Sequence, residues 1–377
     1  MNIIVFGGAG DVGSRAVEDL ARTEGVDRLA IADRAGANAR RLASSIKNPS
    51  AQIEVVEVDA RDPEALKAAM RGYDVAASAL GPFYEFEPKL VQAAVEAGVH
   101  YTSVCDDFSA AQELFEKYDQ PARERGVIIL TGLGTSPGLT NMGVRLTASE
   151  MDVAHRAEIF VYQPLDGGGE AVLRHVLYVM TGDVAEYTGS RIQNVRALSQ
   201  SVVVNFPKFG EVRLWNMGHT EPVTLHRFLP SLNEVKFYMG YGRGAGFFVW
   251  PCRLRLLENP RVQSVVCRVL AAIETLIPKR GTAIGAVRID VYGEREGQEV
   301  LATICGVGNM REATGLSLAV GTRMLARGET TVTGGGVFAP EGCLDPMLFF
   351  QRMQERGITA YRDLDMSNQV AGAKSPD

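Results

Sequence analysis

The stretch Ile3-Ile4-Val5-Phe6-Gly7-Gly8-Ala9-Gly10-Asp11-Val12-Gly13, near the start of the chain, decides the fold. Its apolar run, residues 3–6, leads directly into the pattern Gly-x-Gly-x-x-Gly, and a helical spacing of apolar residues begins at Ser14. A glycine-rich turn between a strand and a helix is typical of the βαβ units that bind dinucleotides. Alone, the six-residue pattern is weak evidence for dinucleotide binding, but its position between a strand and a helix makes it specific.

Each glycine of this turn has its own physical reason. Gly8 allows the tight turn, Gly10 lets the backbone approach a pyrophosphate, and Gly13 lets the helix pack closely on the strand. The unpaired N–H groups of the helix N-terminus favour an anion there, so we expect Asp11 and Val12 to border it as well. The alternative interpretation is a turn that holds no ligand.

Asp33 ends the next apolar run, 23 residues beyond Gly10. A carboxylate at this position accepts hydrogen bonds from the adenosine ribose and repels a 2′-phosphate, which favours NAD. Arg34 follows at once, and Arg40 and Arg41 lie on the next expected helix, so NADP remains possible.

Strand and helix signals alternate regularly through residue 130. Such alternation predicts an α/β fold with a doubly wound parallel sheet of the Rossmann type. Ligands bind beyond the carboxyl ends of the strands of such sheets. We therefore expect the cofactor to be bordered by residues after the third and fourth strands and in the glycine-rich connector 131–139, namely Asp59, Ala60, Leu80, Gly81, Pro82 and Pro137.

The region 140–310 mixes extended segments with a few helices, without regular alternation. This order predicts an inserted α+β domain built on an antiparallel or mixed sheet. The clearest amphipathic helix is expected at 262–277, and we interpret its apolar stripe as a core face or a subunit contact. We also expect one helix at 110–125 and a frayed tail at 368–377.

Composition and charge narrow the class of protein. The chain carries 39 Lys+Arg against 45 Asp+Glu, a formal net charge of −6, which argues against a nucleic-acid partner. Its longest apolar runs fall far short of the ~20 residues of a membrane span, so we expect no membrane partner. Five cysteines without a Cys-x-x-Cys pair, and no signal sequence, predict a cytoplasmic protein with reduced thiols.

Several short motifs together resemble the saccharopine dehydrogenase-like family of NAD(P)-dependent oxidoreductases, which includes saccharopine reductases and lysine 6-dehydrogenases. They are the N-terminal glycine motif, Gly81-Pro82-Phe83, Gly98-Val99-His100-Tyr101, Gly134–Asn141, Glu312-Ala313-Thr314-Gly315 and Gly336–Glu341. The resemblance implies a dinucleotide-binding domain of residues 1–139 plus about 311–377, with a substrate and dimerisation domain at 140–310. It also implies a homodimer, a small amine or amino-acid substrate, and hydride transfer at a carbon–nitrogen bond. Residues 102–107 depart from many relatives, which carry a differently spaced Asp.

Candidate catalytic residues are those that could move a proton. Asp106 and Asp107 follow the fifth strand, and the alternative for this pair is a cap on the following helix. His219 and Glu221 stand two residues apart in a segment expected to be extended, which would point both side chains to one face. The alternative there is a pair on a surface strand. No third ligand accompanies His219 and His226, so we expect no metal site.

Two other functions fit the same sequence. The chain could reduce another C=O or C=C bond on the same fold, or it could be a dinucleotide-binding sensor without turnover. Asp106, His219 and Glu221 argue against the sensor because they supply titratable groups.

Overall fold

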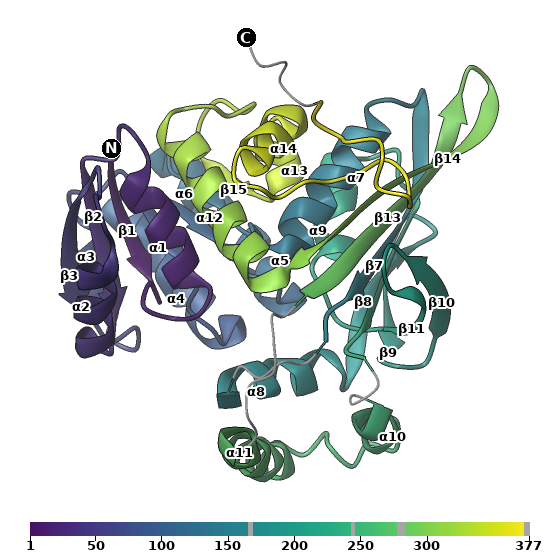
Figure 1. Ribbon diagram of the computed structural model, residues 1–377, viewed down its shortest axis with the longest axis horizontal. Coiled ribbons are helices and arrows are strands. Elements are labelled where there is room, and N and C mark those ends of the chain that lie inside the picture. The colour runs from purple at the N-terminus through teal and green to yellow at the C-terminus, as the bar shows by residue number, and fades with distance from the viewer. Residues whose placement is uncertain (165–168, 243–245, 277–283, 373–377) are drawn as a thin grey trace. The chain divides into compact units, whose positions relative to one another are not determined.

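The structure, a computed structural model, describes residues 1–164, 169–242, 246–276 and 284–372 (Figure 1). The chain forms two compact units. Unit 1 contains Met1–Met142 and Arg311–Gly357, and unit 2 contains Gly143–Met310 and the residues from Ile358 onward. Within the described ranges no helix is long and apolar enough to span a membrane.

Unit 1 is built on a parallel sheet of seven strands in the order β15-β6-β5-β4-β1-β2-β3. Its central strands are apolar on both faces because helices cover both; Ile3, Ile4 and Val5 of β1 are fully buried. The C-terminal part of the chain supplies the edge strand β15, which confirms the expected Rossmann sheet. The strands are β1 (Asn2–Phe6), β2 (Arg28–Asp33), β3 (Gln52–Glu57), β4 (Val75–Ser78), β5 (His100–Ser103), β6 (Ile128–Leu130) and β15 (Gly336–Phe338).

Helices pack on the two faces of this sheet. One face shares a hydrophobic core with α3–α6. The other face contacts α1 and α12, and there the hydroxyls of Thr102 on β5 and Thr322 on α12 form a hydrogen bond of 2.7 Å. The helices are α1 (Gly13–Arg22), α2 (Gly36–Ser45), α3 (Pro63–Met70), α4 (Phe83–Ala97), α5 (Phe108–Lys117), α6 (Asp119–Arg125), α12 (Met310–Ala326), α13 (Pro340–Cys343) and α14 (Pro346–Gln354).

Local signals explain where several helices begin and end. Asp62 caps α3 by accepting hydrogen bonds from two backbone N–H groups, each at 3.1 Å, as its position before Pro63 suggests. The single helix expected at 110–125 is wrong, because the chain breaks at Tyr118 between α5 and α6. Pro121 has no N–H to donate to the preceding turn, which accounts for the break.

Unit 2 contains a mixed sheet of eight strands. Six form the path β10-β11-β12-β7-β13-β14, and β8 joins β12 to β9. Only β7 and β12 pair in parallel among these neighbours. The strands are β7 (Val153–Tyr162), β8 (Asp183–Thr188), β9 (Ile192–Arg196), β10 (Ser201–Phe206), β11 (Gly210–Asn216), β12 (Glu234–Gly240), β13 (Ile284–Arg295) and β14 (Gln298–Asn309).

Two helical segments lead from unit 1 to unit 2: η1 (Thr135–Leu139), which lies in unit 1, and α7 (Thr140–Ala148), which begins there and continues into unit 2. The further helices of unit 2 are α8 (Gly169–Val179), α9 (Glu221–Phe228), α10 (Gly246–Arg253) and α11 (Pro260–Leu276).

The end of the chain departs from the expected domain boundary. We expected residues through 377 to complete the dinucleotide-binding domain, but the segment from Ile358 belongs to unit 2. Tyr361 forms backbone bridges with Cys305 of β14 and with Gln369, which fastens this segment to the second sheet. The expected frayed tail is therefore ordered as far as residue 372, and residues 373–377 lie outside the described part.

Candidate functional site

The glycine turn between β1 and α1 has the tight geometry expected of it. The N–H of Gly10 donates to the carbonyl of Gly7 at 3.0 Å, and Ser14 N–H donates to the Gly10 carbonyl at 2.9 Å. A Cβ on Gly13 would lie 2.2 Å from the Gly7 oxygen, so no larger residue fits there. A Cβ on Gly10 would meet only that oxygen, at 3.1 Å, and the residue is otherwise open to solvent.

This combination fits a bound pyrophosphate. Gly13 is needed for packing, whereas Gly10 is exposed and leaves a cradle that a side chain would fill. Val12 is the N-terminal cap residue of α1, so the free N–H groups of the helix begin at the turn. The side chain of Asp11 forms an ion pair with Arg311 of α12 at 2.8 Å.

Asp33 lies at the end of β2, where the adenosine ribose is expected. Its carboxylate accepts hydrogen bonds from Ala9 N–H at 3.3 Å and Ala35 N–H at 2.8 Å, which ties the glycine turn to the next loop. Arg34 is exposed beside it. At the end of β3, Arg61 donates to Asp59 and, together with Arg34, lowers the pKa of that carboxyl.

The residues after β4 lie against the same turn. A Cβ on Gly7 would come within 3.1 Å of the backbone of Ala79 and Leu80, so the two loops are in close contact. The N–H of Leu80 donates to the hydroxyl of Ser78 at 3.2 Å. Apart from its two chain neighbours, no atom of the described residues lies within 4 Å of the position that a Cβ on Gly81 would occupy, so this loop is open there. The structure thus brings two separate sets of expected cofactor residues together.

Helix α12 contributes to this region in a way that the sequence did not predict. The Oγ1 atoms of Thr135 and Thr314 lie 3.0 Å apart, which holds the connector containing Pro137 against α12. A Cβ on Gly315 would lie 2.7 Å from the Val12 carbonyl, so α12 packs directly on the start of α1. The sequence motif at 312–315 contains both Thr314 and Gly315, but its pattern does not predict which part of the chain they contact.

A buried carboxyl, Glu87 of α4, is a titratable group of unit 1 that lies outside the expected site residues. It accepts hydrogen bonds from the hydroxyls of Tyr101 (2.8 Å), Ser103 and Thr131 (3.4 Å). Burial raises the pKa of Glu87 to about 7, against the opposing effect of these donors. The group therefore links α4 to the ends of β5 and β6 and titrates near neutral pH. Sequence reasoning missed it.

Asp106 and Asp107 take different positions after β5. Asp107 is fully buried and caps α5, accepting hydrogen bonds from Ser109 N–H at 3.1 Å and Ala110 N–H at 3.3 Å. This confirms the cap that we weighed as the alternative for the pair. Asp106 is half-buried at the carboxyl end of the sheet.

His219 and Glu221 lie in unit 2, and their local structure corrects the sequence interpretation. The segment is not extended: Thr220 precedes α9, and Glu221 with Pro222 forms its first turn. Pro222 is well suited to that position because a helix start needs no donor there. Both side chains are buried, so a surface strand pair is also wrong.

The two groups nevertheless meet. Nδ1 of His219 hydrogen-bonds to the Glu221 carboxylate, and the imidazole stacks on Phe237 of β12 with ring centroids 4.2 Å apart. A buried carboxylate on one ring nitrogen fixes the orientation of the imidazole. Such a pair can hold a proton at the other ring nitrogen.

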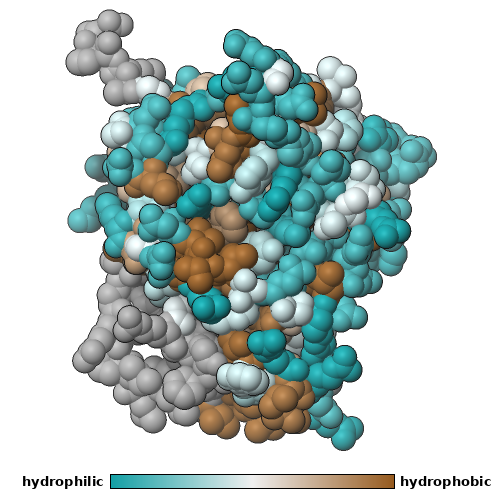
Figure 2. All heavy atoms as spheres, turned by 90° about the vertical axis from the view of Figure 1, so that its right-hand side faces the viewer, coloured by the Kyte–Doolittle hydropathy of each residue, from teal (hydrophilic) through white to brown (hydrophobic). Residues whose placement is uncertain are grey.

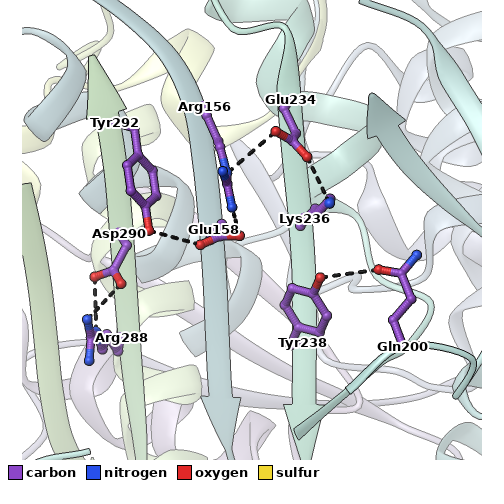
Figure 3. A network of polar contacts seen from close by, with 9 residues as sticks. All are labelled: Arg156, Glu158, Gln200, Glu234, Lys236, Tyr238, Arg288, Asp290 and Tyr292. Atoms are coloured by element: carbon purple, nitrogen blue, oxygen red, sulfur yellow. Dashed lines mark hydrogen bonds and ion pairs between the residues drawn. The ribbon is translucent and has the colours of Figure 1, made fainter. Parts of the chain in front are cut away.

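One face of the second sheet carries an ordered row of charged groups (Figure 3). Arg288 forms two hydrogen bonds with Asp290, at 3.0 and 2.8 Å, on β13. Across β7 and β12 the row continues through ion pairs and a hydroxyl contact that join Arg156, Glu158, Glu234, Lys236 and Tyr292. On the same face Tyr238 donates its hydroxyl to Gln200 at 3.3 Å. Groups of both signs are thus fixed on neighbouring strands. In the described ranges no cluster of His, Cys, Asp or Glu could hold a metal ion.

A doubly wound sheet, a glycine cradle at its first turn and an acidic residue at the end of β2 define a dinucleotide-binding fold of the Rossmann type, in a chain that also has a second, mixed-sheet unit. Residues 3–130 match the family model described as "Saccharopine dehydrogenase NADP binding domain". The resemblance seen in the sequence is therefore confirmed for residues 3–130 of unit 1.

Individual relatives are distant. A Caenorhabditis elegans "Lipid droplet localized protein" is 26% identical over 150 residues, which cover 38% of this chain and 35% of that protein. Carboxynorspermidine synthase of Vibrio alginolyticus is 23% identical over 325 residues, 78% of each chain. Saccharopine dehydrogenase (L-Glu forming) of Saccharomyces cerevisiae has the same fold, with a TM-score of 0.66 at 15% identity over 95% of this chain and 98% of that one.

Proposed function

We propose that the chain is an NAD(P)-dependent oxidoreductase that transfers a hydride at a carbon–nitrogen bond of an amino acid or an amino-acid adduct. The observation that carries this proposal is the cradle at Gly10 and Gly13, joined to the loop after β4, which fits a dinucleotide. The name of the Vibrio relative, a synthase of a carboxylated polyamine, supports an amine substrate.

The charged face of the second sheet supports the same substrate class. An amino acid or its adduct carries both an ammonium and a carboxylate, so it needs groups of both signs to be recognised. Arg288, Asp290 and Lys236 belong to a row that offers both signs on neighbouring strands.

The dinucleotide that the Gly10 cradle would hold supplies hydride transfer to or from the amine carbon. With the C–H hydride removed in this way, the N–H proton would pass to a base of this chain and an imine would remain. We assign the proton to Nε2 of His219, because Glu221 already holds Nδ1. Asp106 is the alternative proton acceptor, at the carboxyl end of the first sheet.

Steady-state assays test this proposal. NAD- and NADP-linked turnover would be followed at the absorbance of the reduced cofactor, with lysine, saccharopine, polyamines and other ω-amino acids as substrates. We expect turnover with one of these amines, and a loss of about a hundredfold or more in kcat for His219→Gln or Glu221→Gln. Asp106→Asn tests the alternative proton acceptor in the same assay.

His226→Gln provides a matched control. His226 lies on the same helix, but its ring stacks on Tyr187 with centroids 4.4 Å apart and its Nδ1 donates to Pro222. We expect this variant to keep its activity. Tight cofactor binding with no turnover on any amine would refute the amine chemistry. Turnover on a C=O or C=C compound alone would favour a reductase of those bonds. Cofactor binding without turnover on any compound would favour a dinucleotide-binding sensor.

The choice of cofactor is part of the proposal. The carboxylate of Asp33 favours NAD, whereas the family description and the exposed Arg34 favour NADP. We propose NAD as the preferred cofactor, and a comparison of dissociation constants for the two reduced cofactors tests it. A lower value for NADPH would refute that preference.

We also propose a cytoplasmic location and a homodimer. All five cysteines are buried and none forms a disulfide, which suits a reducing compartment. Light scattering on the purified protein measures the subunit number directly.

A further inference from the structure

An exposed apolar surface in unit 2 is made by α10, the turn that follows it, and α11. Its exposed members are Trp250 (66%), Leu254 (62%), Leu256 (60%), Val262 (40%), Val265 (54%) and Val269 (53%), which we call the apolar ridge. Single exposed apolar side chains are ordinary, but six large ones on successive elements are not. Figure 2 shows hydrophobic atoms gathered at the lower end of the molecule, the level of α10 and α11 in Figure 1.

Helix α11 buries its more polar face and exposes apolar side chains, the reverse of a helix that packs on a core. Its polar side packs against the protein: Gln263 donates to the Leu257 carbonyl at 2.6 Å, and Ser264 accepts from Arg174 of α8 at 3.2 Å. Cys267 on the same side is fully buried. The three valines consequently face outward. Of the two interpretations of the stripe, the core face is therefore wrong for these residues, whereas the subunit contact stays a prediction. Leu270, Ile273 and Leu276 are not described at the side-chain level, and Ile277 is outside the described residues.

The turn after α10 is held in place with its leucines outward. Leu254 and Leu256 donate their N–H groups to the carbonyls of Trp250 and Pro251, each at 3.0 Å. Between the two leucines, Arg255 has a left-handed backbone with a φ of 62°. The neighbouring Val249, Cys252 and Leu257 are buried and anchor the segment. The backbone hydrogen bonds and the buried neighbours therefore hold both leucine side chains in exposed positions.

Positive charge surrounds the ridge. Residues 246–269 contain four arginines and one acidic residue, Glu258, in a chain whose net charge is −6. Glu258 is already paired with Arg196. The arginines are all exposed, and among the described residues none forms an ion pair; they are Arg253, Arg255, Arg261 and Arg268.

We propose that the apolar ridge and its arginines dock on an anionic phospholipid surface. Leucine, valine and tryptophan side chains would enter the boundary between headgroups and acyl chains, while arginines at the edge would contact lipid phosphates. A second copy of the chain is disfavoured as the occupant, because its own arginines would face these in a symmetric contact. The proposal revises the expectation of no membrane partner, which rested on the lack of a spanning segment.

Vesicle binding tests the proposal with the full-length chain. Vesicles of phosphatidylcholine alone would be compared with vesicles of equal parts phosphatidylcholine and phosphatidylserine, by co-sedimentation at low and high salt. We expect binding to the anionic vesicles that weakens with salt. Leu254→Ser and Leu256→Ser should each weaken it about tenfold, and Arg261→Gln or Arg268→Gln about fivefold.

The only two tryptophans of the chain give a second readout. In a Trp215→Phe background, Trp250 is the one remaining tryptophan and can be excited selectively. Its emission should shift to shorter wavelength and be quenched by brominated lipids when anionic vesicles are added. The matched control is Val203→Ser with Leu301→Ser, which removes apolar side chains of similar exposure (51% each) from the second sheet. This control should bind like the parent protein.

Three outcomes would overturn the proposal. They are no binding to anionic vesicles, binding with an unchanged Trp250 spectrum, and equal loss of binding in the control variant. A dimer in solution that dissociates with Val262→Ser and Val265→Ser, without vesicle binding, would assign the ridge to a second copy instead. Circular dichroism checks that each variant is folded.

Discussion

Replacing Glu87 by glutamine should remove a large part of the pH dependence of the stability of the protein. The carboxyl is fully buried and accepts hydrogen bonds from three hydroxyls. Its pKa is about 7 in the folded protein, against 4.5 for an ordinary glutamate. The folded state thus binds the proton more tightly than the unfolded state.

The sign and size of the effect follow from this difference. A raised carboxyl pKa means that the stabilisation is complete below about pH 4.5 and is lost as the pH rises to about 7. At ~1.36 kcal/mol for each pH unit between the two pKa values, the loss is about 3 kcal/mol. Glutamine is neutral in both states, so Glu87→Gln should lack this loss.

Urea unfolding followed by circular dichroism at about pH 5 and about pH 8 measures the effect. The free energy of unfolding of the wild type, relative to Glu87→Gln, should fall by about 2.5 kcal/mol between the two conditions, because a small part of the loss has already occurred at about pH 5. Glu85→Gln, an exposed change on the same helix, should follow the wild type. Parallel pH profiles for wild type and Glu87→Gln would refute the assignment.

Further variants separate the cofactor site from the folding of unit 1. Gly10→Ala should weaken cofactor binding at least ~10-fold in calorimetric titration while the melting temperature stays the same. Gly308→Ala should bind normally, because no atom of the described residues other than its chain neighbours lies within 4 Å of the new Cβ. Gly13→Ala places a Cβ 2.2 Å from a backbone oxygen in the same turn, so urea unfolding should show a destabilisation of about 1–3 kcal/mol; wild-type stability would contradict the clash. Asp33→Ser should raise the affinity for NADPH relative to NADH about tenfold, since a charge that repels the 2′-phosphate is removed, and an unchanged ratio would mean that Asp33 does not face the ribose. Asp107→Ala deprives two N–H groups of α5 of their acceptor and should cost about 1 kcal/mol in the same unfolding assay, most of it regained in Asp107→Asn; equal losses in both variants would rule out capping.

The first unit was largely predictable because its signals are local. A strand, a glycine turn and a helix leave their pattern within a dozen residues, and the cap at Asp62 can be identified from the following proline. Glu87 could not be identified in this way. It occupies an ordinary helical position, and the hydroxyls that surround it come from β5 and the end of β6, so its burial depends on how the whole sheet packs.

The second unit shows where local patterns mislead. The segment around His219 reads as extended, yet the proline at position 222 starts a helix, and tertiary burial then brings the histidine and Glu221 together. The stripe on α11 has the spacing of a core face, but spacing cannot tell which side of an amphipathic helix the rest of the protein covers.

The place of β15 in the first sheet has a consequence for synthesis. This strand pairs with β6 but lies more than two hundred residues later in the chain, beyond the large part of the second unit formed by Gly143–Met310. While the intervening residues are translated, the backbone N–H and C=O groups on one side of β6 have no partner strand. A nascent or truncated chain that ends before Gly336 therefore exposes an edge strand that can pair with other chains and aggregate. Chaperone binding should be greatest during that interval.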